Sequence, residues 1–490
     1  MSLCSCSTPC GRGTRPHGSR CRAPTPRPPP LSLTDRRREA AAVGWSAYAA
    51  RLLRRQSRPA PAAIAAIVHT AFWRDQDTYV GPVIEAVTQR AGPGALRLVG
   101  VGPRRTFAGA TGATGEGPGG AGPLARLETM TPLSALRGAL ALWRDRHARA
   151  ADVTRGDAIR AAARVHDVDL WPILEHQLRA TALVQWTWSA RTMDELGSAL
   201  DHLQSHTVVT YAEAGGIGRA MVLEARRRGI RSIGLQHGFI YRHWLNYLHE
   251  PDEFDVHGDD RGCPIPDLTL LFDGYAESHL RTAGHFPAGN LLVTGSPRLD
   301  TLAARLSAMT PEARIATREA VGAVRPEQTV AVLAAKFSEV RDDLPALVEA
   351  VRAQPDIHLV IKAHPAESAD VYTPLVDGIY NITVAGADLD LASLLGAADV
   401  IVTKNSTVAI DGLVLGIPAV VIGLPNNLSP FVDAGVMVGA HGDVGQALRA
   451  VLYDQQVRAT LKDATVAFVA AHGLRASGTA ATRAAEVIVR

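Results

Sequence analysis

Two residues with side chains suited to anion binding follow a short apolar run in the C-terminal half of the chain. Lys362 and His364 come after the run 357–361, in a Lys-Ala-His-Pro motif that ends at Pro365. An ammonium is a compact positive charge, and an imidazole can donate a hydrogen bond to a phosphate oxygen. Proline fixes the backbone direction directly after the histidine. The motif therefore predicts a phosphate-binding loop at a strand end, with a simple loop-capping histidine as the alternative.

A second motif of the same kind follows the next apolar run but one. It consists of Lys404, Asn405, Ser406 and Thr407, which come after the run 400–403. A strand followed by hydroxyl residues at a helix start presents free backbone N–H groups and the positive end of the helix dipole, and both attract phosphate. Ser406 could instead serve only as a helix N-cap. Because both motifs end strands of one expected parallel sheet, we predict that they share a phosphate.

Lysine is rare in this chain, with four lysines against 47 arginines. Three of the four, Lys336, Lys362 and Lys404, stand at the ends of successive apolar runs. A planar guanidinium does not replace a compact ammonium in every setting. The retained lysines therefore mark the same region as a candidate anion site.

The first half carries its own polar groups at predicted strand ends. Glu213 follows the run 208–211, and Gln236, His237 and Gly238 follow the run 232–235. Ligands of doubly wound sheets bind beyond the carboxyl ends of the strands, so Glu213 and His237 should open toward one crevice. Either could take a proton from an attacking hydroxyl, and Gly238 permits close approach of backbone to a ligand. The alternatives are a glutamate that neutralises a helix dipole and a histidine bound to backbone in a turn.

Other polar groups are expected to be structural. Arg298 and Asp300, in a Gly-Ser-Pro-Arg-Leu-Asp segment, are predicted to pair with each other and to brace the hinge. The histidines between positions 237 and 285 lack the His-x-x-x-His spacing with a carboxylate that is typical of zinc hydrolases. No metal is therefore expected.

The elements that must position these groups alternate between strand and helix, which is typical of parallel α/β sheets. A first series, with a helical insertion at about 132–203, places strands at 62–68, 96–101, 208–211, 232–235, 268–272 and 291–294. A linker of helix and turn is expected at 301–328. A second series places strands at 329–335, 357–361, 382–384, 400–403 and 419–422. We predict two Rossmann-like domains that face a cleft, an N-terminal one at 61–310 and a C-terminal one at 311–490.

The first 60 residues differ in composition from the rest. They hold twelve arginines against Asp35 and Glu39, and four of the five cysteines. Their Pro, Gly and Ser content predicts a disordered basic tail, which we favour over a segment that binds nucleic acid or anionic lipid. Cys263, alone in the remainder, suits a reducing cytoplasm. No apolar stretch reaches the ~18 residues that a membrane span needs.

Together these motifs give the chain a family resemblance over roughly residues 205–425. The Gln-His-Gly, the Gly-Ser-Pro-Arg-x-Asp, the Lys-x-His-Pro and the Ser-Thr at a helix start resemble bacterial GT-B glycosyltransferases of surface-polysaccharide synthesis. The similar families are capsule-synthesis transferases, including those that handle Kdo and sialic acid, and CDP-glycerol glycerophosphotransferases.

The resemblance implies roles for the matching residues. His364 and Pro365 would contact the donor phosphate, and Ser406 and Thr407 would grip it. Gln236, His237 and Gly238 would face the donor from the acceptor domain, and Glu213 is the best-placed general base.

The implied reaction transfers a sugar from a nucleotide-activated donor, CMP-linked sugars among the candidates, to a polysaccharide or glycolipid, without a cofactor. It would take place in the cytoplasm, and contact with the inner face of the membrane and the oligomeric state stay open. A nucleotide-sugar 2-epimerase and a non-catalytic binding protein on a transferase scaffold are the alternatives.

Overall fold

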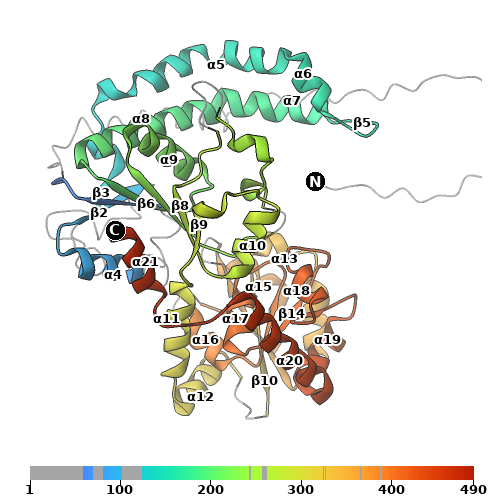
Figure 1. Cartoon of the computed structure of the whole chain (residues 1–490). Helices are drawn as coiled ribbons and strands as arrows, with labels where there is room; N and C mark the ends of the chain where they lie inside the picture. The colour runs from blue at the N-terminus through green and yellow to red at the C-terminus, as the bar shows by residue number, and fades with distance from the viewer. Residues whose placement is uncertain are drawn as a thin grey trace, which may run out of the picture.

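The computed structural model describes residues 59–69, 81–101, 124–241, 244–256, 262–323, 325, 327–364, 367–386 and 389–490. Residues 1–58 of the expected tail, the glycine-rich stretch 109–122 and Pro365 lie outside these ranges. The described chain forms two parallel α/β units, which Figure 1 shows one above the other. This is the GT-B-like architecture predicted from the alternating pattern.

The first unit is built on a seven-stranded parallel sheet with the order β3-β2-β1-β6-β7-β8-β9. Its strands are β1 (Ile64–His69), β2 (Leu96–Val101), β3 (Ala125–Arg126), β6 (Thr207–Tyr211), β7 (Arg231–Leu235), β8 (Leu268–Leu271) and β9 (Leu291–Val293). Side chains alternate between the faces of a strand. Ile64, Ala66 and Val68 of β1 accordingly enter one hydrophobic core, and Ala65 and Ile67 enter the core on the opposite face.

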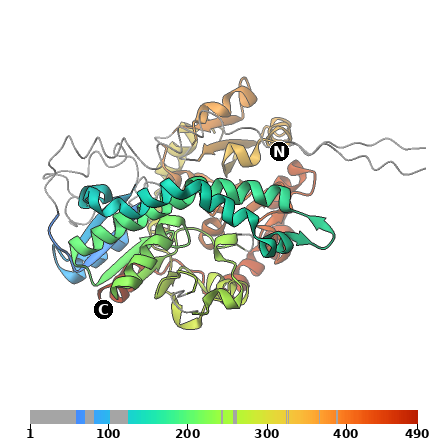
Figure 2. The ribbon, with the colours of Figure 1, turned by 90° about the horizontal axis from the view of Figure 1, so that it is seen from above.

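Helices cover both faces of this sheet. Ile84 and Val87 of α4 pack on one face, and Leu200 of α8 and Met221 of α9 pack on the other. Helices fill the region predicted as a helical insertion: α7 and α8 follow each other end to end through a π-helical turn (Thr181–Gln185), and α5 runs beside both of them (Figure 2). The helices of this unit are α4 (Gly81–Ala91), α5 (Arg137–Arg155), α6 (Asp157–Ala162), α7 (Trp171–Ala180), α8 (Trp186–Leu203), α9 (Gly216–Arg228) and α10 (Gly274–Thr282), with an antiparallel hairpin of β4 (Arg164–Val165) and β5 (Val168–Asp169).

The second unit is a six-stranded parallel sheet with the order β12-β11-β10-β13-β14-β15. Its strands are β10 (Thr329–Ala335), β11 (Ile357–Ala363), β12 (Ile382–Ala385), β13 (Val400–Thr403), β14 (Ala419–Val421) and β15 (Val438–Gly439). Alternate residues of β10 again enter separate cores, one that contains Leu333 and one that contains Val332. The helices are α13 (Phe337–Val340), α14 (Leu344–Arg352), α15 (Thr373–Val376), α16 (Leu391–Ala397), α17 (Val408–Leu415), α18 (Ser429–Asp433), α19 (Val444–Tyr453) and α20 (Gln455–His472).

The segment 301–328, expected to be a linker of helix and turn, contains the end of α11 (Pro297–Ser307) and all of α12 (Pro311–Ala320), with residues 308–310 between them. Each begins with a proline after a hydroxyl cap: Ser296 accepts from the Leu299 N–H at 3.2 Å, and Thr310 accepts from the Ala313 N–H at 3.2 Å. Both helices pack against α16 of the second unit.

The chain ends by returning to the first unit. The final helix, α21 (Ala480–Val489), lies in the range 311–490 expected for the C-terminal domain, yet it packs against α4 (Figure 1). Ala484, Ala485 and Ile488 are buried in the core beneath the first sheet. The chain therefore crosses twice between the two units.

Candidate functional site

The strand order sets where a ligand should bind. In the first sheet β1 lies between β2 and β6, and in the second sheet β10 lies between β11 and β13. The strand order therefore reverses between β1 and β6 and between β10 and β13, and each reversal is a topological switch point. Open α/β sheets bind ligands at the carboxyl ends of the strands beside such a point. Glu213 follows β6 at the first switch point, and Lys336 and Lys404 follow β10 and β13 at the second.

The amino end of α17 is where the sequence predicts a phosphate site, and the protein's own hydroxyl groups engage two of its backbone N–H groups. Thr407 is the residue before the helix, and the Ser406 hydroxyl accepts a hydrogen bond from the Val408 N–H at 3.3 Å. The Ser406 N–H in turn donates to the Thr403 hydroxyl at 3.2 Å. Ser406 thus fills the N-cap role considered as the alternative, and a ligand would have to share or replace this contact. Asn405 is turned to the loop after β14, where its Oδ1 accepts from the Asn427 N–H at 3.2 Å.

The two lysines of the predicted motifs are held by the protein itself. Lys362 Nζ donates to the carbonyl oxygens of Gly386 at 2.8 Å and Leu389 at 2.6 Å. Lys404 Nζ forms an ion pair with Asp343 at 2.8 Å. In this structure both ammonium groups therefore fasten loops around the site.

His364 leaves the sheet at the same carboxyl edge as Ser406 and Thr407. The register pairs Ala363 of β11 with Ala335 of β10, and β10 lies between β11 and β13. Two strand spacings, about 10 Å, therefore separate the two loops. His364 is exposed, and partial desolvation together with the charge of Lys336 lowers its pKa. Its imidazole is accordingly neutral near pH 7.

The loop after β7 reaches this edge from the first unit. The Phe239 N–H donates to the Thr407 hydroxyl at 3.4 Å, and the Phe239 ring lies 5.1 Å from the ring of Phe431 in the second core. Gln236 shapes the loop, because its amide donates to the Gly238 carbonyl at 2.9 Å and accepts from the Phe272 N–H at 2.8 Å. The structure thus brings the predicted residues Gln236, Gly238 and Thr407 together across the two units.

Glu213 is buried at the switch point of the first sheet, with 3% of its surface exposed. Its Oε1 accepts from the Tyr247 hydroxyl at 2.8 Å, and its Oε2 has no hydrogen-bond partner among the described residues. Burial raises the pKa of Glu213 to about 7, while the Tyr247 hydrogen bond and the Arg219 charge oppose that rise. A carboxyl group poised near neutrality can both accept and donate a proton.

His237 follows β7, the strand beside β6, and differs from Glu213 in proton affinity. Its ring meets Trp244 edge to face at 5.3 Å, and Trp244 in turn meets Tyr247 at 5.0 Å. Burial lowers the pKa of His237 to about 4. A base that weak is poorly matched to work at neutral pH, so Glu213 is the better candidate of the two.

Arg298 and Asp300 do not pair with each other as expected. Arg298 forms a buried ion pair with Asp411 of α17, and Asp300 accepts from the Ala480 N–H at 2.8 Å. Arg298 therefore links α11 to the helix whose amino end forms the candidate phosphate site.

Sequence reasoning missed one residue that shapes the site. Tyr247 holds the Glu213 carboxyl, and no spacing rule connects the two positions. Lys336 was expected in the anion region, since it ends an apolar run as Lys362 and Lys404 do.

The cavity at this edge that is lined by Gln236, Phe239 and Thr407 is small, about 30 Å³. A groove of about 1100 Å³ lies instead at the amino edge of the second sheet, beside Met309, Pro418 and Val466. The polar residues follow the carboxyl ends of the strands, at the opposite edge of the sheet, so this groove is not part of the candidate site.

No helix among the described residues combines the length and apolarity that crossing a bilayer would require.

No protein-family model and no curated protein matches the sequence. The fold, however, is similar to solved structures. UDP-GlcNAc 2-epimerase from Neisseria meningitidis bound to UDP-GlcNAc superposes with a TM-score of 0.52 at 12% identity, over 87% of this chain and 98% of that one. MnaA of S. aureus in complex with UDP superposes with a TM-score of 0.51 at 13% identity, over 85% of this chain and 93% of that one. A glycosyltransferase from Rickettsia africae superposes with a TM-score of 0.50 at 10% identity, over 87% of this chain and 98% of that one. These likenesses confirm the GT-B-like fold of two Rossmann-like domains.

Proposed function

We propose that this protein is a glycosyltransferase that takes a sugar from a nucleotide-activated donor. The observation that carries the proposal is the contact of Phe239 with Thr407, where polar strand ends of both sheets meet. A transferase needs donor and acceptor on opposite sides of such a junction. Structures with this fold include one bound to UDP-GlcNAc and one bound to UDP, which supports a nucleotide sugar as ligand.

The donor phosphates would lie at the amino end of α17, beside the hydroxyl groups of Ser406 and Thr407 and the positive end of the helix dipole. His364 would donate a further hydrogen bond from the neighbouring loop. Lys362, Lys404 and Lys336 would add positive charge around the leaving group. These contacts would stabilise the negative charge that develops on the nucleotide as the glycosidic bond breaks.

Glu213 would act as the general base. Its pKa of about 7 leaves a substantial fraction of the carboxylate ionised at neutral pH, and its Oε2 is uncommitted. The carboxylate would take the proton of the acceptor hydroxyl as that oxygen attacks the sugar carbon. Because the Tyr247 hydroxyl holds the other carboxylate oxygen, the acceptor would have to enter beside Tyr247. The acceptor itself is proposed to be a surface polysaccharide or glycolipid.

Product analysis tests the proposal. The full chain is incubated with UDP-, CDP- and CMP-sugars, with and without saccharide acceptors, and the products are separated by mass spectrometry and NMR. A transferase releases nucleotide in step with a lengthened acceptor. Conversion of the donor to an epimer without acceptor would support a 2-epimerase instead, and failure to turn over or bind any of the donors would support a non-catalytic scaffold.

A further inference from the structure

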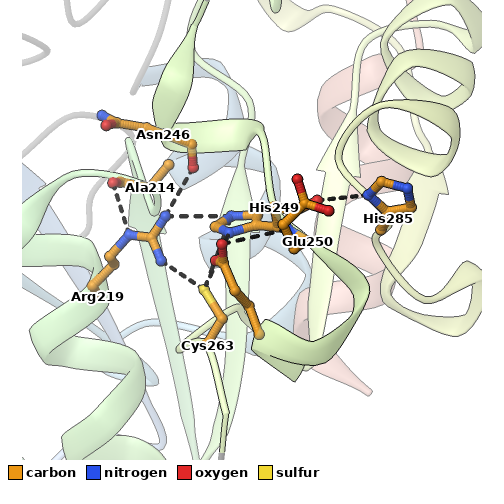
Figure 3. A network of polar contacts seen from close by, with 8 residues as sticks. Ala214, Arg219, Asn246, His249, Glu250, Cys263 and His285 are labelled. Atoms are coloured by element: carbon orange, nitrogen blue, oxygen red, sulfur yellow. Dashed lines mark hydrogen bonds and ion pairs between the residues drawn. The ribbon is translucent and has the colours of Figure 1, made fainter. Parts of the chain in front are cut away.

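A compact group of charged and nucleophilic side chains lies beside the Glu213 loop, apart from the predicted phosphate site. It joins Arg219 of α9, His249 and Cys263, which Figure 3 labels, with Glu253 of the short helix Pro251–Phe254, which bonds to His249. We call these four residues the Cys263 cluster. They come from three separate segments of the chain, so their convergence is a product of the fold.

Arg219 is the hub of the Cys263 cluster. Its Nη1 donates to Cys263 Sγ at 2.8 Å, while Nε donates to the Ala214 carbonyl at 3.1 Å and Nη2 to the Asn246 carbonyl at 2.8 Å. Two backbone carbonyls thus fix the guanidinium in place with one edge turned toward the sulfur. A sulfur that receives a short hydrogen bond from a permanent cation is favoured as the thiolate.

His249 also lies beside the sulfur. Its Nδ1 bonds Glu253 Oε2 at 2.6 Å, and its ring nitrogens lie 3.8 and 3.9 Å from Cys263 Sγ. The neighbouring sulfur and then the Glu253 carboxylate raise the pKa of His249 against the effect of burial. Burial alone would raise the pKa of the Cys263 thiol, but His249 and Arg219 outweigh it, and the net pKa is lowered.

The backbone delivers Cys263 to this position. Gly262 has a φ of +68°, and a Cβ there would come within 2.7 Å of the Phe254 carbonyl oxygen. The Cys263 N–H donates to the Glu253 carbonyl at 2.6 Å. Cys263 stays partly exposed, so a small reagent can reach it.

His249, Glu253 and Cys263 offer a mixed set of atoms that lie within 4.8 Å of one another and could hold a metal ion. Arg219 argues against this use. Its guanidinium already donates to the sulfur and stands 3.5 Å from His249 Nε2, so a divalent cation would meet a fixed positive charge. The His249 to Glu253 bond also occupies two of the candidate ligands.

We propose that the Cys263 cluster holds Cys263 as a nucleophilic thiolate and makes it a modification site for hydroperoxides and alkylating electrophiles. With a hydroperoxide, the sulfur attacks one peroxide oxygen, an S–O bond forms and the O–O bond breaks. The sulfur is oxidised to a sulfenic acid and the peroxide is reduced. The departing hydroxide or alkoxide takes a proton from the solvent, which reaches the partly exposed sulfur, and leaves as water or an alcohol.

The first test measures the reactivity of Cys263 in the full chain. Short pulses of iodoacetamide between pH 5.5 and 9, followed by peptide mass spectrometry, give the alkylation rate at Cys263. We expect a midpoint below that of an ordinary thiol, about 8.5, and faster reaction at pH 7 than a cysteine-containing model peptide. A midpoint at or above the ordinary value, or no alkylation, would overturn the proposal.

A pair of neighbouring variants assigns the effect to the Cys263 cluster. Glu253→Gln removes the negative charge beside His249 and keeps an oxygen that can accept its hydrogen bond. Glu253 and Asp252 are both exposed, so neither Glu253→Gln nor Asp252→Asn should affect folding. We expect Glu253→Gln to slow alkylation at pH 7 by roughly twofold to fivefold, the value of a half-exposed ion pair, and Asp252→Asn to leave it unchanged. Equal rates in all three proteins would contradict the charge arrangement.

Two further measurements separate oxidation from metal binding. After treatment of the protein with hydrogen peroxide, dimedone should react with the sulfenic acid formed at Cys263. Absence of dimedone on Cys263 would refute the hydroperoxide reaction. Zinc that copurifies in stoichiometric amount and blocks alkylation would show instead that the Cys263 cluster is a metal site.

Discussion

Glu213 is the residue on which the proposed chemistry depends most. It stands at the switch point of the first sheet, it is buried, and one of its oxygens is uncommitted among the described residues. A buried carboxyl group is costly to ionise. Proteins retain such groups where a proton must be taken up or released, and this gives the position a physical reason to be functional.

The ionisation of Glu213 should be visible in stability. Its folded pKa, about 7, is above the ordinary value of 4.5, so the folded state binds the proton more tightly than the unfolded state. Stability from this group is full below pH 4.5 and is lost as the pH rises to 7. Relative to Glu213→Gln, the wild type should lose on the order of 3 kcal/mol across this window. Urea denaturation at several pH values measures the free energy of unfolding of both proteins. The same pH dependence in the wild type and in Glu213→Gln would contradict the raised pKa of Glu213.

The same group should set the acid limb of the pH–rate profile. Glu213→Gln should lower kcat by about 10²–10⁴-fold, the usual contribution of a general base. Tyr247→Phe removes a hydrogen bond that lowers the Glu213 pKa, so it should move the acid limb of kcat/KM to higher pH. A Glu213→Gln enzyme with normal kcat would leave His237 as the remaining candidate.

At the scale of elements, the fold is organised by helices that meet across the two units. Arg298 at the start of α11 and Asp411 in α17 are both buried, with 7% and 6% of their surfaces exposed. Burial raises the pKa of Asp411 and the Arg298 charge opposes it. The pair therefore fixes the position of α17, and with it the candidate phosphate site, relative to α11.

Breaking this pair should cost far more than breaking a surface pair. Arg298→Met leaves Asp411 buried without its partner and should destabilise the protein by about 3–5 kcal/mol, whereas the double variant with Asp411→Leu should recover most of that loss. Arg352→Met, which breaks the exposed pair with Glu349, should change stability by less than about 1 kcal/mol. Calorimetric or urea denaturation gives the values, and similar losses for Arg298→Met and Arg352→Met would contradict this account.

The elements that sequence predicted well are those whose own residues determine them. Buried runs such as 329–335 and 400–403 match β10 and β13 residue for residue, because continuous apolar stretches bounded by polar groups are strand signals. The partner of Arg298 could not be predicted, since Asp411 is distant in sequence and no spacing rule joins them. The same holds for Tyr247 and for the Cys263 cluster, which only the folded arrangement of 214–263 brings together.

At the scale of the molecule, the return of α21 makes the two units interdependent. Nothing in the alanine-rich pattern of 480–489 indicates which sheet it covers, and its place beside α4 follows from tertiary packing. Ile488, only 1% exposed, is part of the core beneath the first sheet. The last residues of the chain thus stabilise the unit formed by its first strands.

A charged side chain on the buried face of α21 should therefore destabilise the first unit. Ile488→Asp places an unpaired carboxylate in the core and should cost more than about 3 kcal/mol. Val466→Asp, at a position on α20 that is 63% exposed, should stay within about 0.5 kcal/mol. Hydrogen exchange locates the effect, which we expect in α4 and β1. Unchanged protection of α4 in Ile488→Asp would show that α21 contributes little.

The central claim is that the carboxyl edge of the second sheet binds the phosphates of a nucleotide donor. Isothermal titration of UDP, CDP and CMP into the wild type, His364→Ala and the surface control His176→Ala tests it most directly. We predict that the wild type and His176→Ala bind at least one nucleotide with equal affinity, and that His364→Ala binds it about tenfold more weakly, the loss of one charge-assisted hydrogen bond. Equal affinity in all three proteins, or no binding of any nucleotide, would contradict the claim.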